Sequence, residues 1–326
     1  MRVFVAGASG AIGTQLVPRL IEQGHEVVGT ARSPAGLKRI GTLGADAVAL
    51  DLLDHEAVRR AVSEATPDAV VHQATALADL RFSRNLDRSF AETNKLRTAG
   101  TDALLAAARE AGVQRFVAQS FAPARYAREG GAVKSEDDPL DPRPVPTTRK
   151  TNAAMRYLDE AVTGAGGIAL RYGSFYGASN DALPDPVRKR QLPIVGSGDG
   201  MSSFVHVEDA AAATVIALEQ GVPGVYNIVD DEPAPVREWL PVLASALGAK
   251  PPRRVPRWVA RLVAGEAAVM MGTEARGASN AKAKRELGWT LRYPTWRRGF
   301  VAAYGPAPVS DRSTMPEPRG ERLQHT

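Results

Sequence analysis

The chain has 326 residues, 44% of them hydrophobic, which is enough for one large domain or two modest ones with a substantial core. It has no cysteine, which excludes disulfides, thiolate catalysis and cysteine-ligated metal and fits a reducing cytoplasm, the expected location. The net charge of +5 comes without a nucleic-acid-binding motif, and no window of 18 uncharged apolar residues is present, so we expect neither a nucleic-acid nor a membrane partner.

Short apolar runs alternate with helical patterns through the first half of the chain. We predict strands at residues 3–6, 26–30, 47–50, 69–72, 115–119 and 168–172. We predict helices at residues 12–23, 35–43, 55–63, 90–111 and 152–162. This alternation predicts an α/β fold, a doubly wound parallel sheet of the Rossmann type, in which ligands bind beyond the carboxyl ends of the strands.

The pattern changes after Tyr172. Residues 173–203 are rich in Gly, Pro and Asp and are predicted to be mostly loop, followed by strands at 204–207 and 225–229 and a helix at 210–218. Helices at 236–247, 257–271, 281–287 and 296–304 would form a smaller, mostly helical C-terminal cap. We expect a dinucleotide-binding domain at 1–175 with 203–230 contributing, a substrate-binding cap within 176–304, and a disordered tail at 305–326.

The first predicted strand runs into a turn with three glycines at a spacing of three, Gly7, Gly10 and Gly13. An amphipathic helix pattern follows at Ile12, Leu16 and Leu20. Glycines allow the backbone to approach phosphates, and a helix N-terminus supplies free N–H groups and positive dipole. An ordinary glycine-rich turn is the alternative, but the position between a strand and a helix favours a pyrophosphate site.

Two further strand ends carry candidate cofactor residues. The second strand is followed by Arg32 and Ser33, with no carboxylate that could bind ribose hydroxyls, so the pattern favours NADP(H) over NAD(H). The alternative for Arg32 is an ordinary surface arginine. Asp51 and Leu52 follow the third strand, where Asp51 could accept a hydrogen bond from adenine or act in the first turn of a helix.

Together these motifs resemble the extended short-chain dehydrogenase/reductases, the NAD-dependent epimerase/dehydratase family. The resemblance covers about residues 1–300 and rests on their order and spacing. Besides the glycine turn and Asp51-Leu52, the matching stretches are residues 70–76, Asn94 with Gly100-Thr101, residues 170–177 and residues 204–211.

The resemblance implies a role for each matching position. Gly7, Ser9, Gly10, Ala11, Ile12 and Gly13 would hold the pyrophosphate, and Asp51 and Leu52 would flank adenine. Ala74, Thr75 and Ala76 would pass behind the nicotinamide ribose, and Asn94 would organise the active-site helix. The backbone of Tyr172, Gly173, Ser174 and Phe175 would face the nicotinamide, and Tyr176 would line the substrate cleft.

The chain departs from the family at its catalytic pair. The family's acid–base residue is a Tyr four residues before a Lys, whose charge lowers the high pKa of the tyrosine. Here Thr147 and Thr151 stand at those positions, and if Lys150 is taken as the lysine, the tyrosine position becomes Pro146. Neither register gives a Tyr–Lys dyad, so the chain resembles an atypical subgroup of the family, in which the dinucleotide fold is expected to be intact and the usual dyad is absent.

Three other residues are candidates for the missing chemistry. Ser120 could bind a substrate carbonyl, Tyr126 could donate a proton, and Lys150 could bind cofactor or polarise a carbonyl. Their alternatives are a cofactor or backbone contact, a loop aromatic and a solvated helix residue. Trp258 and Met270 could line an apolar substrate site or form the core of the cap. No metal-ligand spacing is present, so we expect no metal.

These features favour an NADP(H)-dependent oxidoreductase that reduces an activated carbonyl, enone or imine of a small, fairly apolar metabolite. The alternatives are a non-catalytic NADP(H)-binding sensor, or a nucleotide-sugar epimerase or dehydratase, against which the missing dyad counts. A homodimer could form through the helices that follow strands four and five. The alanine-rich face at Ala103, Ala106, Ala107 and Ala108 would permit it, but packing within the chain explains that face equally well.

Overall fold

The computed structural model describes residues 1–77, 83–178 and 181–305. Its centre is a seven-stranded parallel sheet in the order β12-β7-β5-β4-β1-β2-β3, so the predicted doubly wound α/β fold is confirmed. The order reverses between β1 and β4, which is where such sheets bind ligands. The strands are β1 (Arg2–Ala6), β2 (Glu26–Ala31), β3 (Asp46–Ala49), β4 (Ala69–His72), β5 (Arg115–Phe121), β7 (Ile168–Tyr172) and β12 (Gly224–Ile228).

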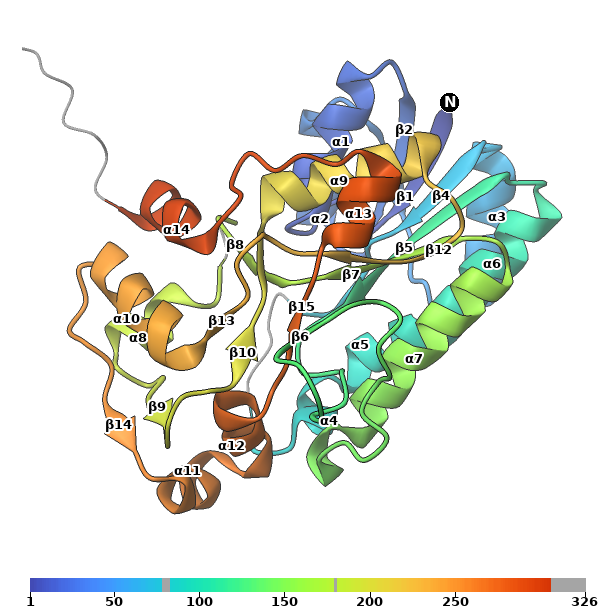
Figure 1. The fold of residues 1–326 in the computed structure, drawn as a ribbon. Helices are drawn as coiled ribbons and strands as arrows, with labels where there is room; N and C mark the ends of the chain where they lie inside the picture. Colours follow the sequence, from blue (N-terminus) through green and yellow to red (C-terminus); the bar gives the residue numbers. More distant parts are fainter. Residues whose placement is uncertain (78–82, 179–180, 306–326) are drawn as a thin grey trace, which may run out of the picture.

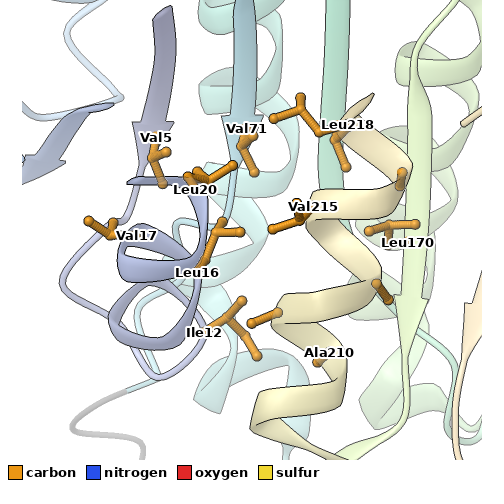
Figure 2. Packing of buried hydrophobic residues seen from close by; sticks show 14 of the residues in the cluster. Val5, Ile12, Leu16, Val17, Leu20, Val71, Leu170, Ala210, Val215 and Leu218 are labelled. Carbon is orange, nitrogen blue, oxygen red and sulfur yellow. The ribbon is translucent and has the colours of Figure 1, made fainter. Parts of the chain in front are cut away.

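One face of the sheet is covered by α1 (Gly13–Glu22), α2 (Pro34–Thr42) and α9 (Val207–Gln220). Figure 2 shows α1 and α9 side by side over the strands, with Leu16 and Leu20 of α1 and Val215 of α9 turned toward Val71. The spacing of four between Leu16 and Leu20 gives α1 one apolar stripe, and burial of that stripe fixes the helix behind the glycine turn.

The opposite face is covered by α3 (His55–Ala65), α6 (Thr101–Glu110) and α7 (Arg149–Gly164) (Figure 1). Ala103, Ala107 and Ala108 are buried in the apolar cluster on this side, whereas Ala106 is exposed. Small side chains therefore let α6 pack closely inside the chain, which accounts for most of the alanine-rich face.

The helix predicted at 90–111 is a composite. It consists of α5 (Ala91–Lys95), a π-helical turn (η1, Leu96–Gly100) and α6, and the short α4 (Leu86–Ser89) precedes it. Amphipathic periodicity alone does not reveal a π-helical turn, because the apolar positions on either side of it still point inward. Such turns occur often at functional sites.

The cap consists of short helices and strand pairs beside the carboxyl ends of the sheet (Figure 1). Its apolar centre includes Phe204, Trp239, Trp296 and Phe300. The cap helices are α8 (Pro184–Arg188), α10 (Val236–Ala246), α11 (Arg257–Ala264), α12 (Glu266–Thr273) and α14 (Trp296–Tyr304). The short strands are β8 (Ser174–Tyr176), β9 (Ile194–Val195), β10 (Met201–Ser202), β11 (Phe204–His206), β13 (Ala234–Pro235) and β14 (Arg254–Val255).

Two sequence-based expectations for this part of the chain need correction. The stretch 173–203 is mostly loop as predicted, with β8, α8, β9 and β10 as its short elements. The predicted helix at 257–271 is two helices, because Gly265 has a φ of +90° that ends α11. α13 (Ala281–Leu287) does not join the cap but packs against α9 and β12, with Ala283 and Leu287 in the apolar cluster on this face of the sheet.

Two further pieces complete the fold. β6 (Val133–Lys134) pairs with β15 (Gly277–Ala278), and a 3-10 turn (η2, Pro146–Thr148) leads into α7. Within the described residues, no helix has the length and apolar character needed to span a membrane. The predicted disordered tail at 305–326 lies, from residue 306 on, outside the described residues.

Candidate functional site

The glycine turn after β1 is packed so tightly that side chains are excluded. Gly7 has a φ of +85°, and a Cβ there would lie 2.7 Å from the Cα of Ala74, which follows β4. A Cβ on Gly13 would lie 2.3 Å from the carbonyl oxygen of Ala8. The turn therefore sits against the neighbouring strand end, at the point where the strand order reverses.

The same turn presents unused donors at the start of α1. Gly10 N–H donates to the Gly7 carbonyl at 3.1 Å, but the N–H groups of Ala11, Ile12 and Gly13 have no acceptor within the described chain. A cleft of about 380 Å³ adjoins them, lined by Ala11, Thr14, Gln15, Gly177, Ala178, Ala303 and Tyr304. Free N–H groups at a helix N-terminus beside an open cleft fit the pyrophosphate of a dinucleotide.

Basic and hydroxyl side chains border this turn at the end of β2. Arg32 is exposed, and Ser33 caps α2 because its Oγ accepts from Gly36 N at 3.1 Å. Arg39, which the sequence analysis did not single out, donates from Nη1 to the Ser9 carbonyl at 3.1 Å. Its signal was weak, because Arg39 lies in the last turn of α2 and only the fold brings it to the glycine turn.

The two residues predicted to flank adenine lie in different surroundings, one at the surface and one in the core. Asp51 is exposed, and its Oδ1 accepts from Leu53 N at 3.0 Å in a local turn. Leu52 is buried in the apolar cluster under α3 and α6. The structure thus favours a turn-forming role for Asp51 and leaves one carboxylate oxygen, Oδ2, without a partner in the described chain.

The strand ends at the predicted nicotinamide side are tied together by buried hydrogen bonds. Ala76 N donates to Thr93 Oγ1 at 3.1 Å, which fixes the Ala74–Thr75–Ala76 segment to α5. The Tyr172 hydroxyl is 2.6 Å from Thr214 Oγ1 and accepts from Gln73 Nε2 at 3.1 Å. Gly173 lies so close to β11 that a Cβ would be 2.8 Å from the Ser203 carbonyl oxygen.

The residues that follow Gly173 form a short strand before the chain reaches the cleft at Gly177 and Ala178. Ser174 and Phe175 belong to β8, and the Phe175 ring lies 5.3 Å from that of Tyr172. Tyr176 is fully buried in the cap core, and its hydroxyl has no partner within the described residues. Burial strongly raises the pKa of Tyr176. The Tyr176 side chain is therefore part of the cap core and does not line an open cleft as predicted.

The positions of the family dyad are occupied by threonines in a polar cluster. Thr147 lies on η2, and its Oγ1 is enclosed without a partner among the described residues. Thr151 is 8% exposed; its Oγ1 donates to Asp87 Oδ1 at 2.9 Å and accepts from Asn94 Nδ2 at 3.1 Å. Lys150 is exposed, and its backbone N–H donates to Asp87 Oδ2 at 3.0 Å.

Asp87 is a residue that the sequence analysis missed. It accepts three hydrogen bonds from the first turn of α7 through both carboxylate oxygens. A carboxylate at a helix N-terminus is stabilised by the dipole. Its signal was weak, because Asp87 sits on α4, 63 residues before Lys150, and only the fold brings the two together.

Ser120 and Tyr126 belong to a buried network instead of an open cleft. Ser120 Oγ accepts from Arg125 Nη1 at 3.0 Å, and the Tyr126 hydroxyl donates to Asn227 Oδ1 at 2.7 Å. Tyr126 is 2% exposed, and burial raises its pKa. A phenol that is enclosed, with its proton already donated to Asn227, is poorly placed for the predicted proton transfer.

This network is centred on Asp159. Its Oδ2 accepts from Arg125 Nη2 at 2.9 Å and from Arg171 Nε at 2.9 Å, and Arg171 Nη1 donates to the Tyr126 hydroxyl at 3.2 Å. Sequence reasoning missed it, although Asp159 on the apolar face of a helix and Arg171 inside an apolar strand are unusual enough to be a signal.

The two predicted apolar lining residues lie in different surroundings. Trp258 on α11 is 69% exposed. Met270 on α12 is 6% exposed and packs with Val145 and Ala267. Met270 therefore belongs to a small apolar cluster that joins α12 to Val145 outside the cap, and its predicted role in lining a substrate site stays a prediction. Within residues 1–77, 83–178 and 181–305, no group of three histidine or acidic side chains is placed to hold a metal ion.

Comparisons with known proteins find relatives over most of the chain. A model of the NAD dependent epimerase/dehydratase family matches residues 3–229. A 3-diazoavenalumate denitrifying reductase from a Streptomyces species is 42% identical over 92% of this chain and 99% of its own. A 4-hydroxy-2-methyl-3-oxo-4-farnesyl-3,4-dihydroquinoline-1-oxide ketoreductase from Stigmatella aurantiaca is 29% identical over 93% of this chain and 95% of its own.

A similar fold is found among solved structures. The UDP-glucose 4-epimerase of Thermus thermophilus, solved as a complex with NAD, superposes with a TM-score of 0.70 at 25% identity. The match covers 93% of this chain and 98% of that one.

Proposed function

The chain belongs to the NAD dependent epimerase/dehydratase family, and we propose that it is an NADP(H)-dependent reductase of a small, activated metabolite. Its family and its reductase-named relatives make it an NAD(P)-dependent oxidoreductase. The finer proposal rests on two features seen together. The glycine turn from Gly7 to Gly13, the phosphate cradle, has free N–H groups, and threonines stand at both dyad positions. Such a chain can bind a hydride donor but lacks the acid that ordinary carbonyl reduction uses.

The preference for NADP(H) is supported by the residues around the end of β2. Arg32 is exposed there, and Arg39 reaches the carbonyl of Ser9 in the glycine turn. Arginine guanidinium groups bind phosphate bidentately, and no carboxylate follows β2 that would repel a 2′-phosphate. Ser33 Oγ, although it caps α2, can still donate its own proton to a phosphate oxygen.

The nicotinamide, when bound, supplies the hydride. The chain's own residues would hold the dinucleotide, and the Ala76–Thr93 and Asn94–Thr151 hydrogen bonds fix the segment after β4 and the start of α7 to α5 beside it. Threonine hydroxyls are far too weak as acids to protonate an alkoxide at neutral pH. The acceptor must therefore be one whose product needs no strong enzymic acid: an activated carbonyl, an enone or an imine, which can take a proton from water.

A diazo compound meets this requirement most completely. The name of the 42% identical relative describes reductive loss of nitrogen from a diazo compound. When an arenediazonium ion accepts a hydride at carbon, a C–H bond forms, the C–N bond breaks and dinitrogen leaves with the electron pair. The products are an arene, dinitrogen and oxidised nicotinamide, so no proton is required. We therefore favour an aryl diazo substrate as the acceptor.

The two alternatives make different demands on the site. Nucleotide-sugar epimerisation requires a base that removes a proton from a carbinol, and neither Thr147 nor Thr151 can serve as one. A non-catalytic NADP(H) sensor would keep the cradle and need no acid, so only a turnover experiment separates it from a reductase.

The test is isotope transfer with a purified protein. NADPH that carries deuterium at either face of C4 is mixed with an arenediazonium salt, with an enone and with an imine, each with and without protein. With the arenediazonium salt we expect protein-dependent oxidation of NADPH. Deuterium should appear in the product arene with only one of the two labelled forms of NADPH. NADPH binding without turnover of any acceptor would favour the sensor, and absence of NADPH binding would reject both readings.

A further inference from the structure

Arg97 is a buried cation whose hydrogen-bonding capacity is mostly unused. It is 6% exposed, and its Nη1 donates to Asn94 Oδ1 at a long 3.4 Å. Its Nε and Nη2 have no acceptor within the described residues, and neither is a fully enclosed atom. A guanidinium has five N–H donors, so most of its donors remain available for a ligand.

The surroundings of Arg97 do not neutralise it. The charges that act on it most are Arg125, which repels it, and Asp159, which attracts it. Asp159 Oδ2 is already shared by Arg125 and Arg171. Arg97, Arg125 and Arg171 thus share one fully buried carboxylate, and the partly buried Glu136 acts on Arg171 and not on Arg97. Burial lowers the pKa of Arg97 to about 10, so it still carries its charge at neutral pH.

The backbone beneath Arg97 is irregular. Arg97 lies in the π-helical turn of η1, and such turns recur at functional sites. Asn94, to which Arg97 donates, in turn donates to Thr151, the residue at the family's lysine position. The unpaired guanidinium is therefore two hydrogen bonds from the start of α7, where the acid–base pair is missing.

We propose that Arg97 binds a carboxylate of the substrate and so fixes it beside the first turn of α7. This inference rests on the proposed reductase function, because it places the substrate at the nicotinamide side of the sheet. The dinucleotide is not expected to supply the anion: its phosphates fit the glycine turn and the end of β2, and the nicotinamide ring has no anionic group. A planar guanidinium binds a carboxylate through two parallel hydrogen bonds.

The principal alternative is structural. Asp159 Oδ1 is enclosed and has no partner within the described chain, so a buried water could link it to Arg97. In that arrangement Arg97 would stabilise the protein and play no part in ligand binding. The two roles predict different melting temperatures for a ligand-free variant that lacks the Arg97 charge. A structural role predicts a lower melting temperature, and a ligand-binding role predicts no decrease.

The first arm of the test uses the wild-type protein with NADPH bound. Benzoate, cinnamate and 4-hydroxycinnamate are titrated by calorimetry, each against its own amide. We expect at least one acid to bind about tenfold more tightly than its amide, since a desolvated charge pair is worth about 1.4 kcal/mol or more. If no acid binds ahead of its amide, the proposal is wrong.

The second arm uses Arg97→Met, Arg97→Lys and, as a control on the exposed face of α3, Arg60→Met. Arg97→Met should abolish the preference for the acid and leave the NADPH affinity within about twofold. It should not lower the melting temperature, because it removes an unpaired buried charge. Arg97→Lys should keep part of the preference, and Arg60→Met should keep all of it.

The outcomes separate this inference from the proposed function. A large fall in melting temperature for Arg97→Met with an unchanged acid preference would overturn it in favour of the structural role. If Arg97→Met does not fold, that favours the structural role too, unless Arg97→Lys folds and shows a weakened acid preference. Failure of the wild type to bind NADPH would reject the proposed function, whereas NADPH binding with equal affinity for acids and amides would reject only the role of Arg97.

Discussion

Asp159 on α7 and Arg171 on β7 form an ion pair of 2.9 Å between Oδ2 and Nε, with both side chains less than a tenth exposed. The same carboxylate oxygen also accepts from Arg125. One carboxylate of α7 thus holds two guanidinium groups, and the loop after β5 is joined to β7 through it.

We expect Asp159→Asn to be strongly destabilising. The amide keeps the shape of the side chain but leaves Arg125 and Arg171 side by side without a counterion, at a cost of about 3–5 kcal/mol. Urea denaturation measures this loss. Asp185→Asn, which removes an exposed carboxylate with an exposed partner, should change the free energy of unfolding by less than about 1 kcal/mol. Equal effects of the two substitutions would contradict the arrangement.

Arg32→Ala should change the cofactor preference and not the fold. If Arg32 pairs with a 2′-phosphate, its loss should weaken NADPH binding by at least about tenfold and leave NADH binding unchanged. Fluorescence titration with both cofactors measures the two affinities. Arg39→Ala should weaken binding of both cofactors, because Arg39 also holds the Ser9 carbonyl. An equal loss of affinity for NADPH and NADH in Arg32→Ala would contradict the proposed preference for NADP(H).

The glycine turn offers a matched pair of substitutions. Gly7 and Gly24 have φ values of +85° and +80°, but a Cβ at Gly24 meets nothing within 4 Å, whereas one at Gly7 meets the backbone of Ala74. Gly24→Ala should therefore cost only the backbone strain, about 1–2 kcal/mol. Gly7→Ala should lower the melting temperature further and abolish NADPH binding. The cradle would be misassigned if Gly7→Ala bound NADPH normally.

Tyr126→Phe should affect stability and spare turnover. The phenol donates to Asn227 and is enclosed, so its removal leaves a buried acceptor unpaired at a cost of about 1–3 kcal/mol. Because no proton transfer is assigned to it, kcat for the best acceptor should change by less than about threefold. Thr147→Val serves as a comparison at the dyad position and should likewise change kcat by less than about threefold. A loss of kcat of more than about a hundredfold in Tyr126→Phe would restore the proton-donor role.

Asp230 gives the protein a pH-dependent stability. Its side chain is 1% exposed, Oδ2 has no partner in the described residues, and burial raises its pKa to about 8. Below about pH 4 it is neutral in both the folded and unfolded states. Between about pH 4 and pH 8 only the unfolded state releases the proton, so the free energy of unfolding falls as the pH rises.

Asp230→Asn removes this proton linkage. The variant should gain stability relative to the wild type from about pH 5 to pH 8, by an amount on the order of a few kcal/mol. Urea denaturation at both pH values gives the difference. A constant offset between the two proteins across this range would show that Asp230 is ionised in the folded state.

The sequence predicts the sheet well because each strand carries its own signal. Apolar runs bounded by Gly and charged residues mark β1, β4 and β7, and the glycine turn marks the switch point from local residues alone. The break at Gly265 and the π-helical turn at η1 were missed because the apolar periodicity continues on both sides of them. Periodicity reports which face is buried, and it does not report whether the hydrogen bonds of a helix are continuous.

The site was predictable only where its parts are contiguous in sequence. The glycine turn of Gly7 to Gly13 is one segment, so its position between a strand and a helix could be predicted from local residues. Asp87 and Thr151 are 64 residues apart, and Arg125 and Asp159 are 34 apart, so their pairing depends on how α4, α7 and β5 pack. A charged residue in an apolar pattern, such as Arg171, predicts that a buried partner exists, but it does not identify that partner.

The π-helical turn at Leu96–Gly100 also has a consequence for how this chain can vary in length. A π turn holds about one residue more than an α turn, so deletion of a single residue there would restore an ordinary α-helix without breaking it. Everything on its N-terminal side would then rotate by about 100° relative to α6. Asn94 would leave Thr151 and Arg97 would leave the space beside Asp159, so an insertion or deletion at this one place could rebuild the site in a single evolutionary step.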